Sequence, residues 1–75
     1  KEFDEEAVLG LIVELLSGLE LLDPDAVEPI IDTLGVYLPA EDTDTLKERV
    51  AGFDFDGAAG AAKALIRKYQ LEQER

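Results

Sequence analysis

Apolar side chains recur at three- and four-residue steps near the start of the chain, and this spacing constrains the fold more than any other feature. The members of the stripe are Val8, Leu11, Ile12, Leu15, Leu16, Leu19 and Leu22. Residues at these intervals share one face of an α-helix, so the segment predicts an amphipathic helix over about residues 4–22. Asp4, Glu5 and Glu6 fall in its first turn, where carboxylates complement the positive end of the helix dipole.

A second helix is predicted over about residues 24–38. Asp23 is a typical N-cap, and Pro24 suits the first helical position because the N–H that proline lacks is not needed there. The apolar residues that follow at helical spacing are Val27, Ile30, Ile31, Leu34 and Leu38. Pro29 lies deeper in the segment and removes a backbone donor, so we expect a kink or a late start.

A short third helix is predicted over about residues 43–51, with Asp42 or Thr43 as its N-cap. The residues expected to join the core are Leu46, Val50 and Phe53. Gly52 fits the left-handed residue that commonly ends a helix, because glycine adopts a positive φ without steric cost.

The fourth helix is predicted over about residues 54–72, with Asp54 as its N-cap and with Phe53 and Ala58 in the two positions of a hydrophobic staple. Its apolar stripe is Phe55, Ala58, Ala59, Ala62, Leu65, Ile66 and Tyr69. Helices joined by short connections pack as antiparallel neighbours. The sequence therefore predicts an all-α protein, a compact antiparallel bundle of four helices that forms a single domain over residues 1–75.

The chain contains no cysteine and no histidine. Disulfides and thiolate metal sites are therefore excluded, and the commonest general base and metal-binding side chain is missing. We expect no cofactor, and stability must come from helix packing, helped by a partner or a second copy, because so small a domain buries limited surface. The sequence begins at Lys1 rather than methionine, so we expect this domain to have been excised from a longer multidomain protein.

Acidic charge is concentrated in one half of the chain. The net charge is −11: residues 1–46 hold thirteen acidic residues and one basic, whereas residues 47–75 hold five acidic and six basic. Such a surface repels nucleic acid and anionic membranes and attracts a basic protein surface, although the acid could also serve solubility alone. No signal peptide is visible, and Glu14 and Glu20 interrupt the most apolar run, so we expect a cytoplasmic protein without a membrane span.

Two motifs are candidates for chemistry, and neither has the required spacing. A calcium loop that began at Asp54 would need an oxygen ligand, a glycine and a glutamate at the positions that Ala58, Ala59 and Leu65 occupy, so helix capping explains Asp54 better. Ser17 lies deep in the first predicted helix, and no histidine is present to activate it. We therefore predict no enzyme activity, no catalytic, metal or cofactor-binding residue, and no small-molecule substrate.

One strip of the first predicted helix is a candidate for binding a partner. Gly10, Val13 and Ser17 follow an i, i+3, i+7 pattern on the side away from the apolar stripe, and Leu9 flanks them. Such a strip could meet a second helix. The alternative is that the second or third helix of the same chain covers it, because a small domain needs most of its apolar area for its own core.

Residues 53–58 (FDFDGA), followed by an amphipathic helix, resemble the C-terminal helical segments of bacterial hybrid sensor histidine kinases and related multidomain response regulators. Residues 22–27 (LDPDAV), with Ile30, Ile31, Leu34 and a proline-bearing break, are similar to the preceding part of that pattern. The likeness covers about residues 8–70 and rests mainly on a helical rhythm and one short motif.

The resemblance implies a degenerate relative of histidine-phosphotransfer domains, a helical bundle at the end of a signalling chain. The chain lacks the phosphoaccepting histidine of that family, so the resemblance implies no phosphorelay chemistry. The role that it still implies is docking onto another protein. We therefore expect a non-catalytic interaction or regulatory module of a two-component signalling protein, which contacts a receiver or kinase domain or pairs with its own copy. The alternative is a structural dimerisation or linker domain of an unrelated multidomain protein.

Overall fold

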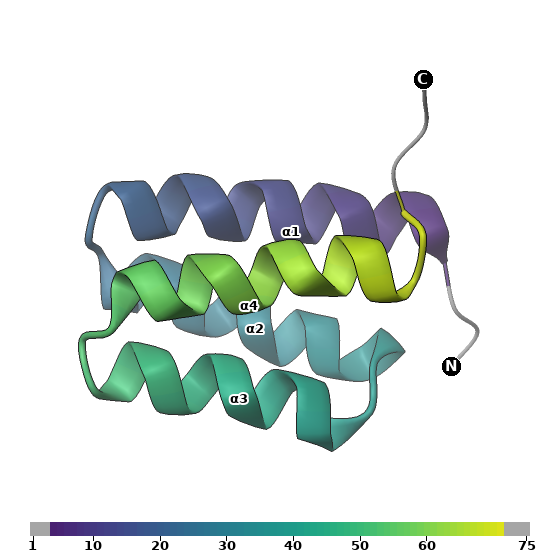
Figure 1. Cartoon of the computed structure of the whole chain (residues 1–75). Helices are drawn as coiled ribbons and strands as arrows, with labels where there is room; N and C mark the ends of the chain where they lie inside the picture. Colours follow the sequence, from purple (N-terminus) through teal and green to yellow (C-terminus); the bar gives the residue numbers. More distant parts are fainter. Residues whose placement is uncertain (1–3, 72–75) are drawn as a thin grey trace.

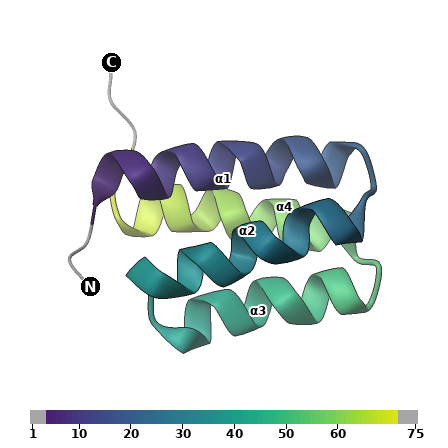
Figure 2. The ribbon, with the colours of Figure 1, turned by 180° about the vertical axis from the view of Figure 1, so that it is seen from behind.

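The computed structural model describes residues 4–71, which form four α-helices and no strand. In chain order the helices are α1 (Glu5–Glu20), α2 (Pro24–Tyr37), α3 (Ala40–Ala51) and α4 (Phe55–Lys68). Each helix packs against the next, and α4 returns to pack against α1, whereas in this part of the chain no Cα atoms of diagonally opposed helices lie within 8 Å of each other. Figures 1 and 2 show the resulting up-and-down arrangement, so the predicted antiparallel four-helix bundle is confirmed.

The core takes side chains from all four helices. Its buried apolar residues are Val8, Ile12, Leu15, Leu19, Val27, Ile31, Leu34, Leu38, Leu46, Val50, Ala58, Ala62, Leu65 and Leu71. All except Leu71 lie on the stripes that the sequence predicts. Two predicted core residues are not in the core: Leu22 is 63% exposed and Phe53 is 71% exposed.

The α1–α2 and α3–α4 connections are the same turn, used twice at one end of the bundle (Figure 1). The backbone N–H groups of Asp23 and Asp54 donate to the carbonyls five residues earlier, over 3.3 and 2.8 Å, as in a Schellman motif. Each aspartate side chain then accepts the N–H three residues later, over 3.3 and 2.9 Å, and so caps the next helix. The predicted caps Asp23 and Asp54 are therefore confirmed.

This turn corrects the predicted end of the third helix. The left-handed residue is Phe53, with φ of 59°, whereas Gly52 has an ordinary φ of −89°. Leu22 holds the equivalent position in the first turn, with φ of 56°. The motif fixes the left-handed position one residue before the capping aspartate, so the backbone register and not the glycine decides which residue adopts it.

The start of α3 also differs from the prediction. The helix begins at Ala40 after Pro39, which serves as an N-cap without a side-chain hydrogen bond, so the predicted start at residue 43 is wrong. Thr43 is buried, and its hydroxyl donates to the carbonyl of Ala40 within the helix. Asp42 does not cap α3 either, because its carboxylate is engaged by α4.

The start of α2 and the end of α4 both differ from the prediction. Despite Pro29, α2 starts at Pro24 and continues to Tyr37, so the late start is wrong.

The described part of α4 ends at Lys68, and a third Schellman turn with φ of 54° at Gln70 follows. In a continued helix Leu71 would lie about 200° from Tyr69, away from the apolar stripe. The turn instead buries Leu71 completely. The predicted helix end at residue 72 is therefore wrong, because the helix ends at Lys68 and residues 69–71 form the turn.

Candidate functional site

The predicted partner strip lies on the open surface of α1. Gly10 and Ser17 are exposed, Val13 is 52% exposed, and Leu9 is half-buried against the core. An added Cβ on Gly10 would meet no atom within 4 Å. Within residues 4–71, therefore, no other helix of the chain covers the outer part of this strip, contrary to the alternative considered from the sequence.

Helical geometry divides the strip into two parts. Successive residues are turned by about 100°, so Leu9 and Leu16, seven residues apart, lie on the same side of α1. Leu16 faces α4, and Val13 is turned only about 60° further outward. Gly10 and Ser17 are turned by about 100–120° from Leu16 and point away from α4. Leu9 and Val13 thus border the α1–α4 interface, whereas Gly10 and Ser17 do not.

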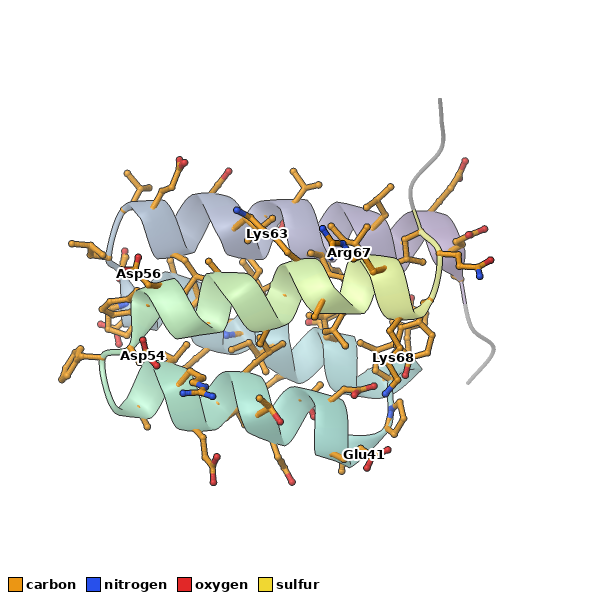
Figure 3. The ribbon with its side chains drawn as sticks, viewed as in Figure 1. Glu41, Asp54, Asp56, Lys63, Arg67 and Lys68 are labelled. Carbon is orange, nitrogen blue, oxygen red and sulfur yellow. The ribbon has the colours of Figure 1, made fainter. Side chains whose placement is uncertain are left out.

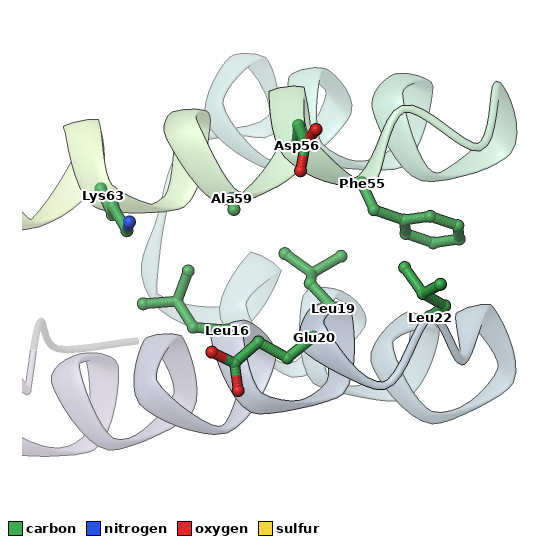
Figure 4. A pocket seen from close by; sticks show the side chains of 8 residues that line it. All are labelled: Leu16, Leu19, Glu20, Leu22, Phe55, Asp56, Ala59 and Lys63. Carbon is green, nitrogen blue, oxygen red and sulfur yellow. The ribbon is translucent and has the colours of Figure 1, made fainter.

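A groove runs between α1 and α4 near the end of the bundle that carries the two turns (Figure 4). It encloses about 430 Å³. The lining residues are Leu16, Leu19, Glu20 and Leu22 from the α1 side, and Phe55, Asp56, Ala59 and Lys63 from α4. Its floor is apolar, and a carboxylate stands on each wall. We call it the α1/α4 groove.

At the turn end the groove meets exposed apolar side chains: Leu22 and Phe55 line it, and Phe53 and Leu21 are exposed at the same end of the bundle. We call these four residues the turn-end surface. Leu21 is 77% exposed, and the ring of Phe53 packs against that of Phe55 edge to face, with 5.9 Å between centroids. This contact replaces the predicted staple, because the mostly exposed Phe53 is directed to Phe55 and away from the core. Leu22 belongs to both surfaces and joins them.

Backbone conformation sets Leu22 and Phe53 apart from ordinary exposed residues. Both have a positive φ, a conformation that costs an L-amino acid roughly 1–2 kcal/mol and that glycine adopts freely. Neither side chain is buried in return. The turn register imposes this conformation, as it does at Gln70, so the feature that makes the turn-end surface a candidate site is its exposure of large apolar side chains.

Two basic residues beside the groove differ from the other basic residues of the described chain because they form no ion pair there. Of the basic residues in the described chain, Lys47 pairs with Asp32, Arg49 with Asp54 and Lys68 with Asp42. Lys63 and Arg67 have no carboxylate within ion-pair distance among residues 4–71. Figure 3 shows both on the side of α4 that faces α1, whereas Lys68 points toward α3. The cations available to a partner thus lie along one side of α4.

Asp42, Lys68 and Tyr69 form the most closely bonded polar cluster, and its role is structural. The Asp42 carboxylate, 10% exposed, accepts a hydrogen bond from Lys68 Nζ at 2.9 Å and from the Tyr69 hydroxyl at 2.5 Å. The hydrogen bond to Asp42 is the main cause that raises the pKa of both Lys68 and Tyr69 above their ordinary values. Both carboxylate oxygens are occupied, so the cluster clamps the start of α3 to the end of α4.

The residues that resemble a calcium loop are explained by capping, as predicted. Asp54 Oδ1 accepts the Gly57 N–H, and Asp54 Oδ2 pairs with Arg49 at 3.1 Å. A Cβ on Gly57 would overlap the Asp54 carboxylate, so glycine is needed for this double use of the side chain. No group of three or more metal-ligating side chains suited to a metal ion exists among residues 4–71.

Sequence reasoning missed the groove because Leu16, Leu19 and Ala59 were assigned correctly to core stripes, and a groove arises only where two such stripes meet. No family model, curated protein or solved structure matches the chain. In the described part of the chain, no helix combines the length and the apolar character that crossing a membrane requires.

Proposed function

We propose that this chain is a non-catalytic protein-docking module that binds a partner through the α1/α4 groove and the turn-end surface. The observation that carries the proposal is the exposure of Leu21, Leu22 and Phe53, between 63% and 77%, on one end of the bundle. Exposure of these apolar side chains to water, two of them on residues with a positive φ, is a cost to the free monomer. Burial against another protein would offset that cost.

The partner belongs, in this proposal, to cytoplasmic two-component signalling. The support is the resemblance carried by residues 53–58, together with an antiparallel four-helix bundle of the kind that the resemblance implies. Because the chain has no histidine, the module would dock onto a receiver or kinase domain without accepting a phosphoryl group. Its acidic surface would favour a basic partner surface and would disfavour nucleic acid or an anionic membrane.

Self-association is a second candidate function, and one observation favours it. Gly10 lies in the middle of an exposed helix face, where glycine costs roughly 1 kcal/mol relative to alanine, and no packing within the described chain requires it. A helix of a second copy that packed closely on Gly10, Val13 and Ser17 would explain the glycine. This is the dimerisation alternative predicted from the sequence.

Docking can be tested by titrating the isotope-labelled chain with a receiver domain and measuring changes in its amide chemical shifts by NMR. We expect shifts on α1, α4 and the turn-end surface, and weaker binding for Leu22→Gly. Val36→Ala is the matched control, because Val36 is also about half exposed but lies on α2. Absence of shifts at millimolar receiver would remove the signalling assignment, and shifts confined to α2 and α3 would show that the surface is wrong.

Light scattering tests self-association. A dimer at tens of micromolar that Val13→Glu dissociates would favour the second candidate. A monomer for the unchanged chain at that concentration would remove it, because a specific interface of biological size associates more tightly.

A further inference from the structure

Charges of opposite sign lie along the α1/α4 groove and its continuation on α4, which runs from Lys63 to Arg67. At the turn end, Glu20 and Asp56 stand on opposite walls (Figure 4). Further along α4, Lys63 and Arg67 lie on the side that faces α1 (Figure 3). In the described chain none of these four side chains has an ion-pair partner, so their charges are available to a ligand.

The dimensions of the charged strip correspond to a short helix. Asp56 and Arg67 are eleven residues apart on α4, or about 16 Å at 1.5 Å per residue. A helix of three to four turns covers that distance. The groove between two antiparallel helices is a common binding site for the apolar face of a third helix. Leu16 and Ala59 supply the apolar surface between the charged ends, and Leu22 extends it at the turn end (Figure 4).

We propose that the occupant of the α1/α4 groove is an amphipathic partner helix with an acidic first turn and a basic last turn, bound antiparallel to α4. Its carboxylates would meet Lys63 and Arg67, and its cations would meet Glu20 and Asp56. This charge order also complements the dipole of the partner helix itself, so one sequence pattern satisfies both requirements. The inference rests on the proposed docking function and specifies the chemistry and direction of the partner.

A second copy of the chain fits this groove poorly. Each copy carries a net charge of −11, so association would bring two strongly acidic molecules together. The exposed side chains of α1 include Glu6, Glu14 and Glu20 and no basic residue. A partner helix that is basic at one end reduces this repulsion beside Glu20 and Asp56. The long-range field of the chain therefore favours a different protein.

The probe is a pair of fluorescein-labelled peptides of about 18 residues, long enough for helix formation to be supported by binding. Both carry leucine at i, i+3, i+4 and i+7 spacing. The first has glutamate in its first turn and lysine in its last, and the second has these charges exchanged, so that composition and net charge are identical. Fluorescence anisotropy with the full chain should show at least fivefold tighter binding of the first peptide. Equal affinities would overturn the inferred direction.

A charge variant of the protein tests the same contact from the other side. Lys63→Glu should weaken the first peptide about fivefold to tenfold and strengthen the second, because one attraction is replaced by a repulsion. Lys47→Glu is the matched control, since it changes the net charge equally but lies on α3, beside Asp32 of α2. Equal effects of the two substitutions would mean that only net charge matters and would overturn the site.

Direction can also be read directly. A nitroxide at the last turn of the first peptide should broaden the amide signals of Glu20 and Leu22 and spare that of Arg67, and the opposite pattern would refute the inferred direction. Failure of both peptides, with a receiver domain still binding on α1 and α4, would reject the helical occupant and leave the docking function standing. Failure of peptides and receiver together would reject both proposals.

Discussion

Replacement of Gly18 by alanine should destabilise the protein, although the same change at two other helical glycines should stabilise it. Gly18 is buried where α1 meets α2, and an added Cβ would lie 2.5 Å from Val27 Cγ1. Carbon atoms in contact prefer about 3.5–4.0 Å, so the overlap is roughly 1 Å. Val27 is fully buried, and a β-branched residue in a helix strongly prefers one χ1 rotamer, so we expect its side chain to resist the shift that the new methyl group demands.

Two opposing effects set the magnitude. Alanine gains up to about 1 kcal/mol over glycine in a helix interior. Overpacking a filled core costs about 1–3 kcal/mol. Gly18→Ala should therefore lie about 1–3 kcal/mol below Gly10→Ala and Gly60→Ala in stability, because an added Cβ at Gly10 or Gly60 meets no atom within 4 Å. For a domain of this size, 1 kcal/mol corresponds to a change of about 4–8 °C in Tm.

Thermal unfolding followed by circular dichroism gives the comparison, and a double-mutant cycle with Val27→Ala isolates the clash. In the Val27→Ala background the methyl of Gly18→Ala has room, so its cost should fall by most of the overpacking energy. A Gly18→Ala variant with a Tm as high as that of Gly10→Ala would refute the close approach of α1 and α2 at this point.

Three further outcomes follow from the structure. Leu22→Gly should be more stable than Leu22→Ala by about 1 kcal/mol in urea unfolding, because both variants lose the leucine side chain and only glycine adopts the positive φ without strain. The reverse order would contradict the left-handed turn. Ala62→Leu should overpack the fully buried α4 stripe and cost about 1–3 kcal/mol, and an unchanged Tm would mean that the stripe is not buried. The pKa values of Tyr69 and Lys68 are raised in the folded protein above their ordinary values of 10.0 and 10.5. The unfolded chain therefore releases these protons first, and the free energy of unfolding should fall as pH rises past those ordinary values. Asp42→Ala should make the loss of stability at alkaline pH less steep. An equally steep loss in that variant would show that the Asp42, Lys68 and Tyr69 cluster does not cause it.

Local chemistry along the chain was sufficient to determine the helices and most of the core. Three- and four-residue apolar spacing, the capping aspartates Asp23 and Asp54, and first-turn acids act within a few residues, and each could be recognised without knowledge of the neighbours. That is why the stripe of α4 was predicted correctly. The same reasoning excluded a calcium loop at Asp54, where the structure shows a cap.

Tertiary structure decided the ends of elements and the composition of the candidate site. Asp42 was predicted as a cap, but Lys68, 26 residues later, and Tyr69 bind its carboxylate once α3 and α4 lie side by side. Leu22 and Phe53 carry the apolar character of core residues, yet the register of the turn places both in the left-handed position on the surface. The α1/α4 groove combines residues about 40 positions apart. Periodicity reports which face of a helix is apolar, but which part of that face stays open depends on where the neighbouring helix lies, and only the packed bundle determines that.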